Sequence, residues 1–123
     1  MKRILLCEDS KALSDFLYET LKANGYDVLT ADNGYDALAR ARNEHPDLVL
    51  LDLMLPKIDG LKICRMLKFD EKYKKIPIII FTAKAEESDQ ALGFQVGADA
   101  YIPKTIGPEK LLEKLKEFLG DNP

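Results

Sequence analysis

Short runs of apolar residues alternate with segments of helical periodicity along this chain. The strongest runs are Ile4–Cys7, Leu48–Leu51 and Ile78–Phe81, and each is bounded by polar or turn residues. Continuously apolar runs of this length are typical of strands buried on both faces of a sheet. Their alternation with helical patterns predicts an α/β domain of three layers, with a parallel sheet between helices.

The pattern predicts about five strand–helix units. Strands are expected near Arg3–Cys7, Asp27–Thr30, Asp47–Asp52, Pro77–Thr82 and Ala100–Ile102. Helices are expected to begin at Ser10, after Asn33-Gly34, at Asp59, after Lys84 and at Gly107-Pro108-Glu109. Ser10 and Asp59 have the side chains that cap helix N-termini. Gly25 and Gly97 fit the left-handed position that closes a helix, and Pro46 ends the second helix.

Four of the expected helices have a recognisable apolar face, and that of the second helix consists of Ala37, Leu38 and Ala41. The first carries Leu13, Phe16, Leu17 and Leu21; the third carries Leu61, Cys64 and Leu67; the last carries Leu111, Leu112, Leu115, Phe118 and Leu119. These faces should cover the sheet.

Polar side chains stand at the ends of four of the predicted strands. Glu8-Asp9, Asp52, Thr82 and Lys104 stand at the ends of the first, third, fourth and fifth apolar runs. In open parallel sheets, ligands bind outside the carboxyl ends of the strands. The pattern therefore predicts one pocket that holds three carboxylates, a hydroxyl and an ammonium group.

This set of groups favours divalent-metal and phosphoryl chemistry. Clustered carboxylates repel one another, and Mg²⁺ relieves that repulsion while it also accepts phosphate oxygens. Asp52 could then act as a nucleophile that forms an acyl phosphate. Each residue also has a structural alternative. Glu8 and Asp9 could favour a helix N-terminus, Asp52 could start a loop, and Thr82 could cap a helix. Lys104 could be a solvated charge or a plain ion pair with a carboxylate.

Composition limits the remaining possibilities. The chain is expected to form one domain, residues 1–123. Its net charge of −3 does not indicate the basic surface that nucleic-acid binding requires. No apolar run is long enough for a signal peptide or a membrane span. Cys7 and Cys64 are read as buried, unpaired thiols, which predicts a cytoplasmic protein. His45 is expected at the surface, so the chain has no catalytic triad, and it also lacks a P-loop and a dinucleotide fingerprint.

The chain resembles the receiver domains of two-component response regulators, in particular the single-domain chemotaxis regulators. The resemblance covers essentially all 123 residues. The motifs that carry it are Leu6-Cys7-Glu8-Asp9-Ser10, Leu50-Leu51-Asp52-Leu53-Met54-Leu55-Pro56-Lys57-Ile58-Asp59-Gly60, Phe81-Thr82-Ala83, Gly97-Ala98-Asp99-Ala100-Tyr101 and Pro103-Lys104. It implies a flavodoxin-like, doubly wound sheet of five parallel strands in the order 2-1-3-4-5, with five helices.

The resemblance also assigns roles to site residues. It implies that Asp52 is the phosphoacceptor and that Asp9, Asp52 and the backbone carbonyl of Met54 bind Mg²⁺, with Glu8 acting through a water molecule. Thr82 and Lys104 would contact the phosphoryl group. Tyr101 would be an aromatic switch that turns inward when Thr82 moves toward that group.

The implied function is that of a signalling phosphoacceptor rather than an enzyme. The donor would be a phosphohistidine on a sensor histidine kinase or a phosphotransfer protein. An output partner or effector domain would bind the face of the fourth helix, fifth strand and fifth helix, through which family members often form homodimers. Leu13 and nearby first-helix residues are a candidate docking site for the kinase, with core packing as the alternative.

Three positions depart from the usual family pattern. Thr105 follows Lys104 where the family has proline, and a cis bond before a residue other than proline costs about 2.5–4 kcal/mol. Met54 is bulky at a position that tunes dephosphorylation, which predicts a long-lived phosphoryl state. Glu8 replaces the commoner aspartate.

Three rival functions stay open at this stage. A phosphatase of the haloacid-dehalogenase type would need a second aspartate where Met54 stands. A flavodoxin-like flavin binder would need a hydroxyl- and glycine-rich first loop where Glu8 and Asp9 stand. A receiver-like binding module that is never phosphorylated is disfavoured by the complete set of acidic residues.

Overall fold

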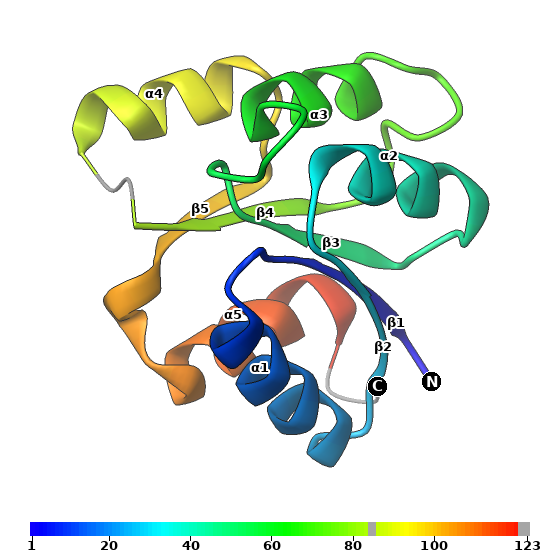
Figure 1. The fold of residues 1–123 in the computed structure, drawn as a ribbon, viewed down its shortest axis with the longest axis vertical. Coiled ribbons are helices and arrows are strands. Elements are labelled where there is room, and N and C mark those ends of the chain that lie inside the picture. The colour runs from blue at the N-terminus through cyan, green and yellow to red at the C-terminus, as the bar shows by residue number, and fades with distance from the viewer. Residues whose placement is uncertain (84–85, 121–123) are drawn as a thin grey trace.

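The computed structural model describes residues 1–83 and 86–120, which form a parallel sheet between two layers of helices (Figure 1). The strand order β2-β1-β3-β4-β5 confirms the predicted topology. The strands are β1 (Arg3–Cys7), β2 (Asp27–Ala31), β3 (Leu48–Leu51), β4 (Ile78–Thr82) and β5 (Ala100–Pro103). The helices are α1 (Lys11–Ala23), α2 (Gly34–Asn43), α3 (Gly60–Lys68), α4 (Glu87–Gln95) and α5 (Pro108–Leu119).

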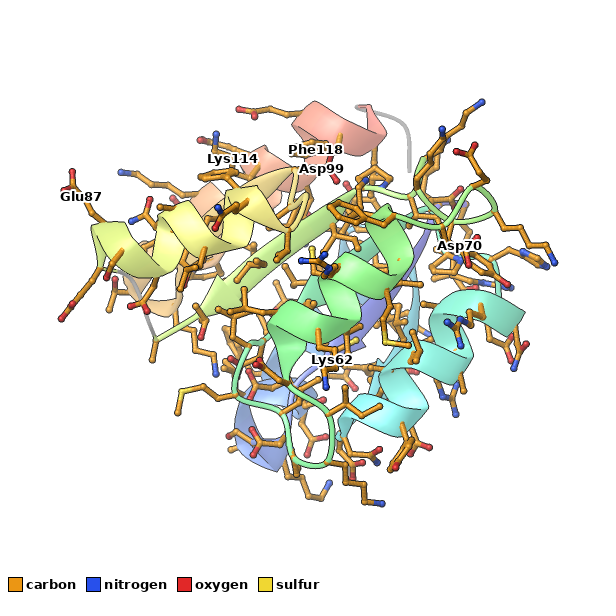
Figure 2. All side chains as sticks on the ribbon, turned by 90° about the horizontal axis from the view of Figure 1, so that it is seen from above. Lys62, Asp70, Glu87, Asp99, Lys114 and Phe118 are labelled. Atoms are coloured by element: carbon orange, nitrogen blue, oxygen red, sulfur yellow. The ribbon has the colours of Figure 1, made fainter. Side chains whose placement is uncertain are left out.

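The strands are continuously apolar because both faces of the sheet are covered. Helices α1 and α5 lie on one face, and α2, α3 and α4 lie side by side on the other (Figures 1 and 2). Since successive strand residues point to opposite faces, the sheet supports two cores. The core under α2 and α3 takes Leu5, Cys7, Val49, Leu51, Ile78 and Ile80 from the strands. The core under α1 and α5 takes Ile4, Leu6, Leu48, Leu50, Ile79 and Phe81.

The helix boundaries follow the local signals in the sequence. Ser10, Asn33 and Asp59 each accept a hydrogen bond from a backbone N–H in the first turn of α1, α2 and α3, respectively. Gly25 and Gly97 follow the C-caps of α1 and α4 with φ angles of 90° and 98°, a conformation that glycine adopts without strain.

The ends of several elements differ slightly from the prediction. β2 extends one residue further, to Ala31, whereas β3 is shorter and leaves Asp47 and Asp52 outside it. Asp47 instead accepts a hydrogen bond from the backbone N–H of Arg3 at 2.7 Å. The helix predicted after Lys84 begins at Glu87; residues 84 and 85 lie outside the described part of the chain.

One residue predicted to face the core does not do so. Leu17 and Leu21 of α1 are buried and Leu13 is half-buried, but the side chain of Phe16 is 53% exposed. The helical period places Phe16 at the border of the apolar face, where about half of its side chain stays accessible to solvent. The expectation that Phe16 belongs to the core was therefore wrong, and the ring lies at the surface beside Leu13.

The two cysteines behave as predicted. Cys7 and Cys64 are buried and free. Burial raises the pKa of the Cys7 thiol far above its ordinary value. It also raises the pKa of the Cys64 thiol to about 12, although Lys68 opposes this shift. Both groups are therefore protonated and unreactive near neutral pH. His45 is exposed, as expected.

Two further expectations concern the backbone and the membrane. In residues 1–83 and 86–120 every peptide bond is trans, including the one between Lys104 and Thr105, which begins a short 3-10 turn at Lys104–Ile106. Across the same residues, no helix combines the length and the apolar character needed to cross a membrane.

Candidate functional site

The strand register brings the predicted polar residues to one edge of the sheet. Cys7 pairs with Leu51, and Leu51 pairs with Ile80, so that β1, β3 and β4 end close together. The backbone N–H of Asp52 donates to the carbonyl of Cys7 at 3.1 Å, which continues the β1–β3 ladder past the strand end. In the order 2-1-3-4-5, the chain reverses direction across the sheet between β1 and β3, and this switch point is where α/β sheets bind ligands.

Asp52 lies at the centre of the site, and its side chain is only 3% exposed. Its Oδ1 accepts hydrogen bonds from the hydroxyl of Thr82 at 2.9 Å and from the backbone N–H of Met54 at 3.1 Å. Its Oδ2 accepts one from the Nζ of Lys104 at 2.8 Å. Both oxygens therefore have donors that stabilise the ionised carboxylate despite its burial.

Lys104 joins two of the buried carboxylates. Its ammonium group lies 2.7 Å from Oε1 of Glu8 and 2.8 Å from Oδ2 of Asp52, and its side chain is 23% exposed. Burial lowers the pKa of Lys104, but hydrogen bonds and charges from Asp52 and Glu8 together outweigh that effect, so the pKa is raised above 10.5. The lysine is thus a fixed positive charge throughout the physiological pH range.

This raised pKa predicts a pH dependence of stability. Because the folded protein binds the Lys104 proton more tightly than the unfolded chain, the contribution of the lysine is complete below pH 10.5 and is lost as the pH rises through the higher folded value. We expect the difference in unfolding free energy between wild type and Lys104→Met to be constant from neutral pH to the mildly alkaline range and then to shrink. Urea unfolding over that range measures it, and a difference that grows with pH would contradict the assignment.

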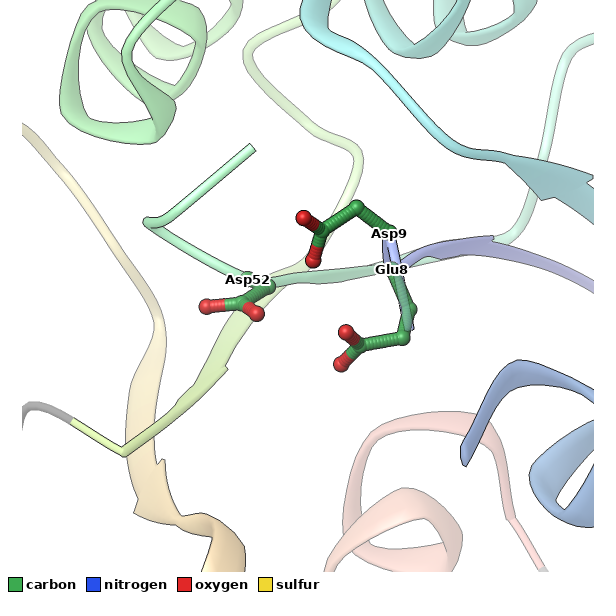
Figure 3. Close-up of side chains that lie close together, drawn as sticks. All are labelled: Glu8, Asp9 and Asp52. Carbon is green, nitrogen blue, oxygen red and sulfur yellow. The ribbon is translucent and has the colours of Figure 1, made fainter. Parts of the chain in front are cut away.

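Three carboxylates converge where a metal ion would be held. One oxygen each from Glu8, Asp9 and Asp52 lies within 4.8 Å of the other two, and Figure 3 shows these side chains coming together from the ends of β1 and β3. Glu8 is 2% exposed, and its Oε2 accepts the backbone N–H of Ser10 at 3.0 Å, whereas Asp9 is open to solvent. A set of oxygen ligands with one solvent-facing side suits a hard divalent cation. The acidic pocket could therefore bind a metal.

Close backbone packing holds the loop that follows Asp52. A Cβ atom at Gly60 would lie 2.6 Å from Cα of Leu53, and the N–H of Gly60 donates to the carbonyl of Leu53 at 3.2 Å. At the other end of the loop, the N–H of Gly34 donates to the carbonyl of Pro56 at 2.9 Å. The first turns of α2 and α3 thus fix the segment that carries Met54. The side chain of Met54 points outward and is 54% exposed, while its backbone contacts Asp52.

Tyr101 lies further from the carboxylates, on β5. Its ring is half-buried and packs against the core under α2 and α3. Burial raises the pKa of its phenol, and the charges of Asp89 and Asp52 raise it further. The phenol of Tyr101 is therefore close enough to the site to be influenced by the charge of Asp52.

An open groove adjoins the metal-binding side of the site. Its volume is about 360 Å³, and it lies between the first turns of α1 and α2; its lining residues are Glu8, Asp9, Lys11, Ser14, Asp15, Thr30, Ala31, Asp32, Asp36 and Arg40. Asp52 and Lys104 do not line this groove, so it leads to Glu8 and Asp9 only.

Some contributors to the site were not anticipated from the sequence. An ion pair of Lys104 with a carboxylate was considered, but its bridging of Glu8 and Asp52 was not. The N–H of Met54 on Asp52 and the N–H of Ser10 on Glu8 were also missed. Backbone N–H donors cannot be recognised from residue types. The loop at residues 55–60 was predicted from its turn residues, but the backbone contacts of Gly34 and Gly60 that support it were not.

Known proteins resemble this chain in sequence and in fold. The family model described as "Response regulator receiver domain" matches residues 4–116. The chain is 41% identical over 118 residues to the alkaline phosphatase synthesis transcriptional regulatory protein PhoP of Bacillus subtilis, covering 96% of this chain and 48% of PhoP. It is 37% identical over 120 residues to the polar-differentiation response regulator DivK of Brucella ovis, covering 98% of each chain.

Solved structures agree with these sequence matches. The receiver domain of the sensor histidine kinase PA1611 from Pseudomonas aeruginosa, whose crystal structure has a magnesium ion in the active-site cleft, aligns with a TM-score of 0.88 and 29% identity over 97% of this chain and 98% of that one. This chain spans about half the length of PhoP but almost all of DivK. From its motifs, its fold and the clustered acidic residues, the chain belongs to the response regulator receiver domain family of two-component systems.

Proposed function

We propose that this chain accepts a phosphoryl group on Asp52 from a phosphohistidine of a sensor histidine kinase or a phosphotransfer protein. The main support for this proposal is the buried Asp52 carboxylate, which lies between Lys104 and Thr82. The carboxylates of Glu8 and Asp9 lie beside it. A purely structural aspartate would need neither a hydroxyl nor a shared lysine at this edge of the sheet.

The donor set favours Mg²⁺ as the cofactor. Asp9, Asp52 and the backbone carbonyl of Met54 would hold the ion, with Glu8 acting through a water molecule. When bound, it would neutralise negative charge on the carboxylates and the incoming phosphoryl oxygens. The magnesium in the PA1611 receiver supports this assignment. Because Glu8 is already paired with Lys104, a water-mediated role fits it better than direct coordination.

The transfer step itself belongs to Asp52. One carboxylate oxygen forms a bond to phosphorus while the bond between phosphorus and the histidine nitrogen breaks, and the imidazole leaves with its electron pair. Lys104 and Thr82, now 2.8 and 2.9 Å from Asp52, are placed to donate to the phosphoryl oxygens of the product. Their fixed positions supply electrostatic stabilisation without reorganisation. The chain promotes only its own phosphorylation and dephosphorylation, so we class it as a signalling phosphoacceptor and not as an enzyme.

Incubation with acetyl phosphate and Mg²⁺ tests the proposal. We expect intact-mass spectrometry to show one phosphoryl adduct that requires Mg²⁺ and is released by hydroxylamine, as an acyl phosphate should be. Steady release of phosphate from an ester substrate would instead indicate a phosphatase. The absence of any adduct would leave a binding module that is not phosphorylated.

We propose that Thr82 and Tyr101 couple phosphorylation of Asp52 to a change at the protein surface. As Thr82 is drawn to the phosphoryl group, Tyr101 would turn inward and bias the surface formed by α4, β5 and α5. Leu92 and Phe94 of α4 are both about half exposed, which leaves apolar area there for an output partner, an effector domain or a second copy of the chain.

The net negative charge of the chain gives no support for direct contact with DNA. We place the protein in the cytoplasm, where unpaired thiols such as Cys7 and Cys64 are usual.

Kinase docking is proposed for the edge between α1 and α5. A small groove of about 70 Å³ lies there, and its lining includes Leu13, Phe16, Pro108 and Lys104. This groove therefore connects the exposed ring of Phe16 with Lys104 of the site. With a sensor kinase that phosphorylates the wild type, we expect Phe16→Ala to slow transfer by about tenfold, as the loss of a good interface anchor does. Labelling by acetyl phosphate should not change, and an unchanged kinase rate would contradict the docking assignment.

Met54 is expected to lengthen the life of the phosphorylated state. Its bulky side chain is 54% exposed and belongs to the residue two positions after Asp52, where it would obstruct an attacking water molecule. Met54→Ala should therefore shorten the half-life of the adduct several-fold while its formation is unaffected. Decay of the labelled protein after removal of acetyl phosphate measures this, and an equal or longer half-life in the variant would refute the idea.

A further inference from the structure

Helix α4 contacts the rest of the protein in an unusual way. Its single buried residue is Gly93, while Leu92 and Phe94 on either side are exposed. Glycine in the middle of a helix is unfavourable, because it costs backbone entropy and brings no side chain to the core. We therefore expect a neighbouring group to occupy the space beside Gly93 on the face of α4 that meets the sheet.

That group is the ring of Tyr101. A Cβ atom at position 93 would lie 2.8 Å from Cδ2 and 3.0 Å from Cε2 of Tyr101, and 3.0 Å from Cδ1 of Ile80. Contacts this short are not tolerated, so one group would have to move. Ile80 can turn its terminal methyl group away, but its backbone is fixed within the sheet between β3 and β5. Cδ2 and Cε2 lie on one edge of the Tyr101 ring, so the ring has to rotate about χ1 or χ2 before both atoms are clear of the added Cβ.

We propose that Gly93 is a positioning residue for Tyr101: the missing side chain on α4 creates the space in which the ring rests against the helix. This inference depends on the proposed switch role of Tyr101. It adds a second determinant to the ring position, on the helix that forms part of the output surface. Asp52 and Thr82 would influence the ring from the site, and Gly93 decides whether the ring can lie beneath α4 at all.

Substitution of Gly93 should therefore separate phosphorylation from switching. In Gly93→Ala the ring is excluded from its observed position, or α4 is displaced from β5 to make room for it. Either change alters the surface of α4, β5 and α5 in the unphosphorylated protein. Asp52, Thr82 and Lys104 are not touched, so formation of the adduct should be unaffected.

The experiment uses the full chain labelled with 3-fluorotyrosine and observed by ¹⁹F NMR. The five tyrosines give five signals, and the signal missing in Tyr101→Phe identifies Tyr101. In the wild type we expect this signal to shift when acetyl phosphate and Mg²⁺ are added. In Gly93→Ala we expect it to be displaced before phosphorylation and to lose at least half of that later shift, with an adduct yield within about twofold of the wild type.

Ser88→Ala serves as the matched control. Ser88 is an exposed residue of α4, so this change also favours the helix but adds no atom near Tyr101. It should leave the Tyr101 signal and its shift as in the wild type. If Ser88→Ala reproduces the effect of Gly93→Ala, helix propensity and not ring packing is responsible, and the inference is overturned.

Two further results separate the possible failures. A wild type without an adduct refutes the proposed function, whereas a phosphorylated Gly93→Ala with an unaltered Tyr101 signal and shift refutes the present inference alone. Should Gly93→Ala fold poorly, Gly93→Ala combined with Tyr101→Ala removes the ring that clashes and should restore folding. A double variant as unstable as Gly93→Ala would show that the ring is not the group obstructed.

Discussion

The Asp52→Asn variant is expected to fold and to take up no phosphoryl group from acetyl phosphate. The amide has nearly the shape of the carboxylate, and its oxygen can still accept the hydroxyl of Thr82 and the N–H of Met54, at 2.9 and 3.1 Å in the wild type. Its oxygen is not a nucleophile that could form an acyl phosphate. The loss of the adduct should therefore be complete, while the fold is retained.

The comparison needs a control that removes a nearby charge but not the nucleophile. Asp15 is exposed on α1, forms a surface ion pair with Lys11 and lines the adjoining groove. Asp15→Asn should give the wild-type yield of adduct by intact mass. An adduct that persists in Asp52→Asn with the same sensitivity to hydroxylamine would place the phosphoryl group on another carboxylate and overturn the assignment.

The Lys104→Met variant is expected to lose both stability and phosphorylation rate. Methionine keeps most of the apolar stem but removes the charge that lies within 2.8 Å of Glu8 and Asp52. Two carboxylates that are 2% and 3% exposed would then repel each other without compensation. We expect a loss of roughly 2–3 kcal/mol, below the about 3–5 kcal/mol of a fully buried pair, because water still reaches the lysine.

The same change removes a donor to the phosphoryl group. Loss of one preorganised donor of this kind typically costs about 10²–10³-fold in rate. Labelling by acetyl phosphate at fixed Mg²⁺ measures this effect, and urea unfolding measures the stability. The destabilisation should be smaller when Mg²⁺ is present or when Asp52 is also asparagine, since each reduces the uncompensated charge.

Lys114→Met is the corresponding control. Lys114 pairs with Glu117 on the exposed face of α5, where an ion pair contributes little. Its substitution should change neither the phosphorylation rate nor, beyond a few tenths of a kcal/mol, the stability. If Lys104→Met behaves in the same way, the lysine is only a solvated charge and the proposed role of the bridge between Glu8 and Asp52 is wrong.

Most of the architecture was predictable because its causes are local. The runs at β1, β3 and β4 are apolar on both faces, and such strands have to be covered on both sides. The cap at Ser10, the left-handed turn at Gly25 and the break before Pro46 depend on conformational preferences of one or a few residues. The strand order required more than local signals, and it was predicted from the resemblance to receiver domains.

The candidate site was predictable in its membership but not in its contacts. The rule that parallel strands end at the same edge was sufficient to bring Glu8, Asp52, Thr82 and Lys104 together. Phe16 illustrates the limit of a periodic pattern, because a residue at the border of an apolar face is buried only if a neighbouring element reaches it. Gly93 is a second example. A glycine within a helix does not show from the sequence which side chain will pack against it.

The sequence by itself determined the alternation of strands and helices, the residues that end each strand and the kind of chemistry that those residues support. Those features follow from side-chain polarity and backbone preference along the chain. Only the tertiary structure decided that Lys104 bridges Glu8 and Asp52, that the N–H of Met54 completes the hydrogen bonding of Asp52, and that Gly93 accommodates Tyr101. These contacts join residues on different strands, helices and loops, and their distances are set by how the two helical layers pack on the sheet.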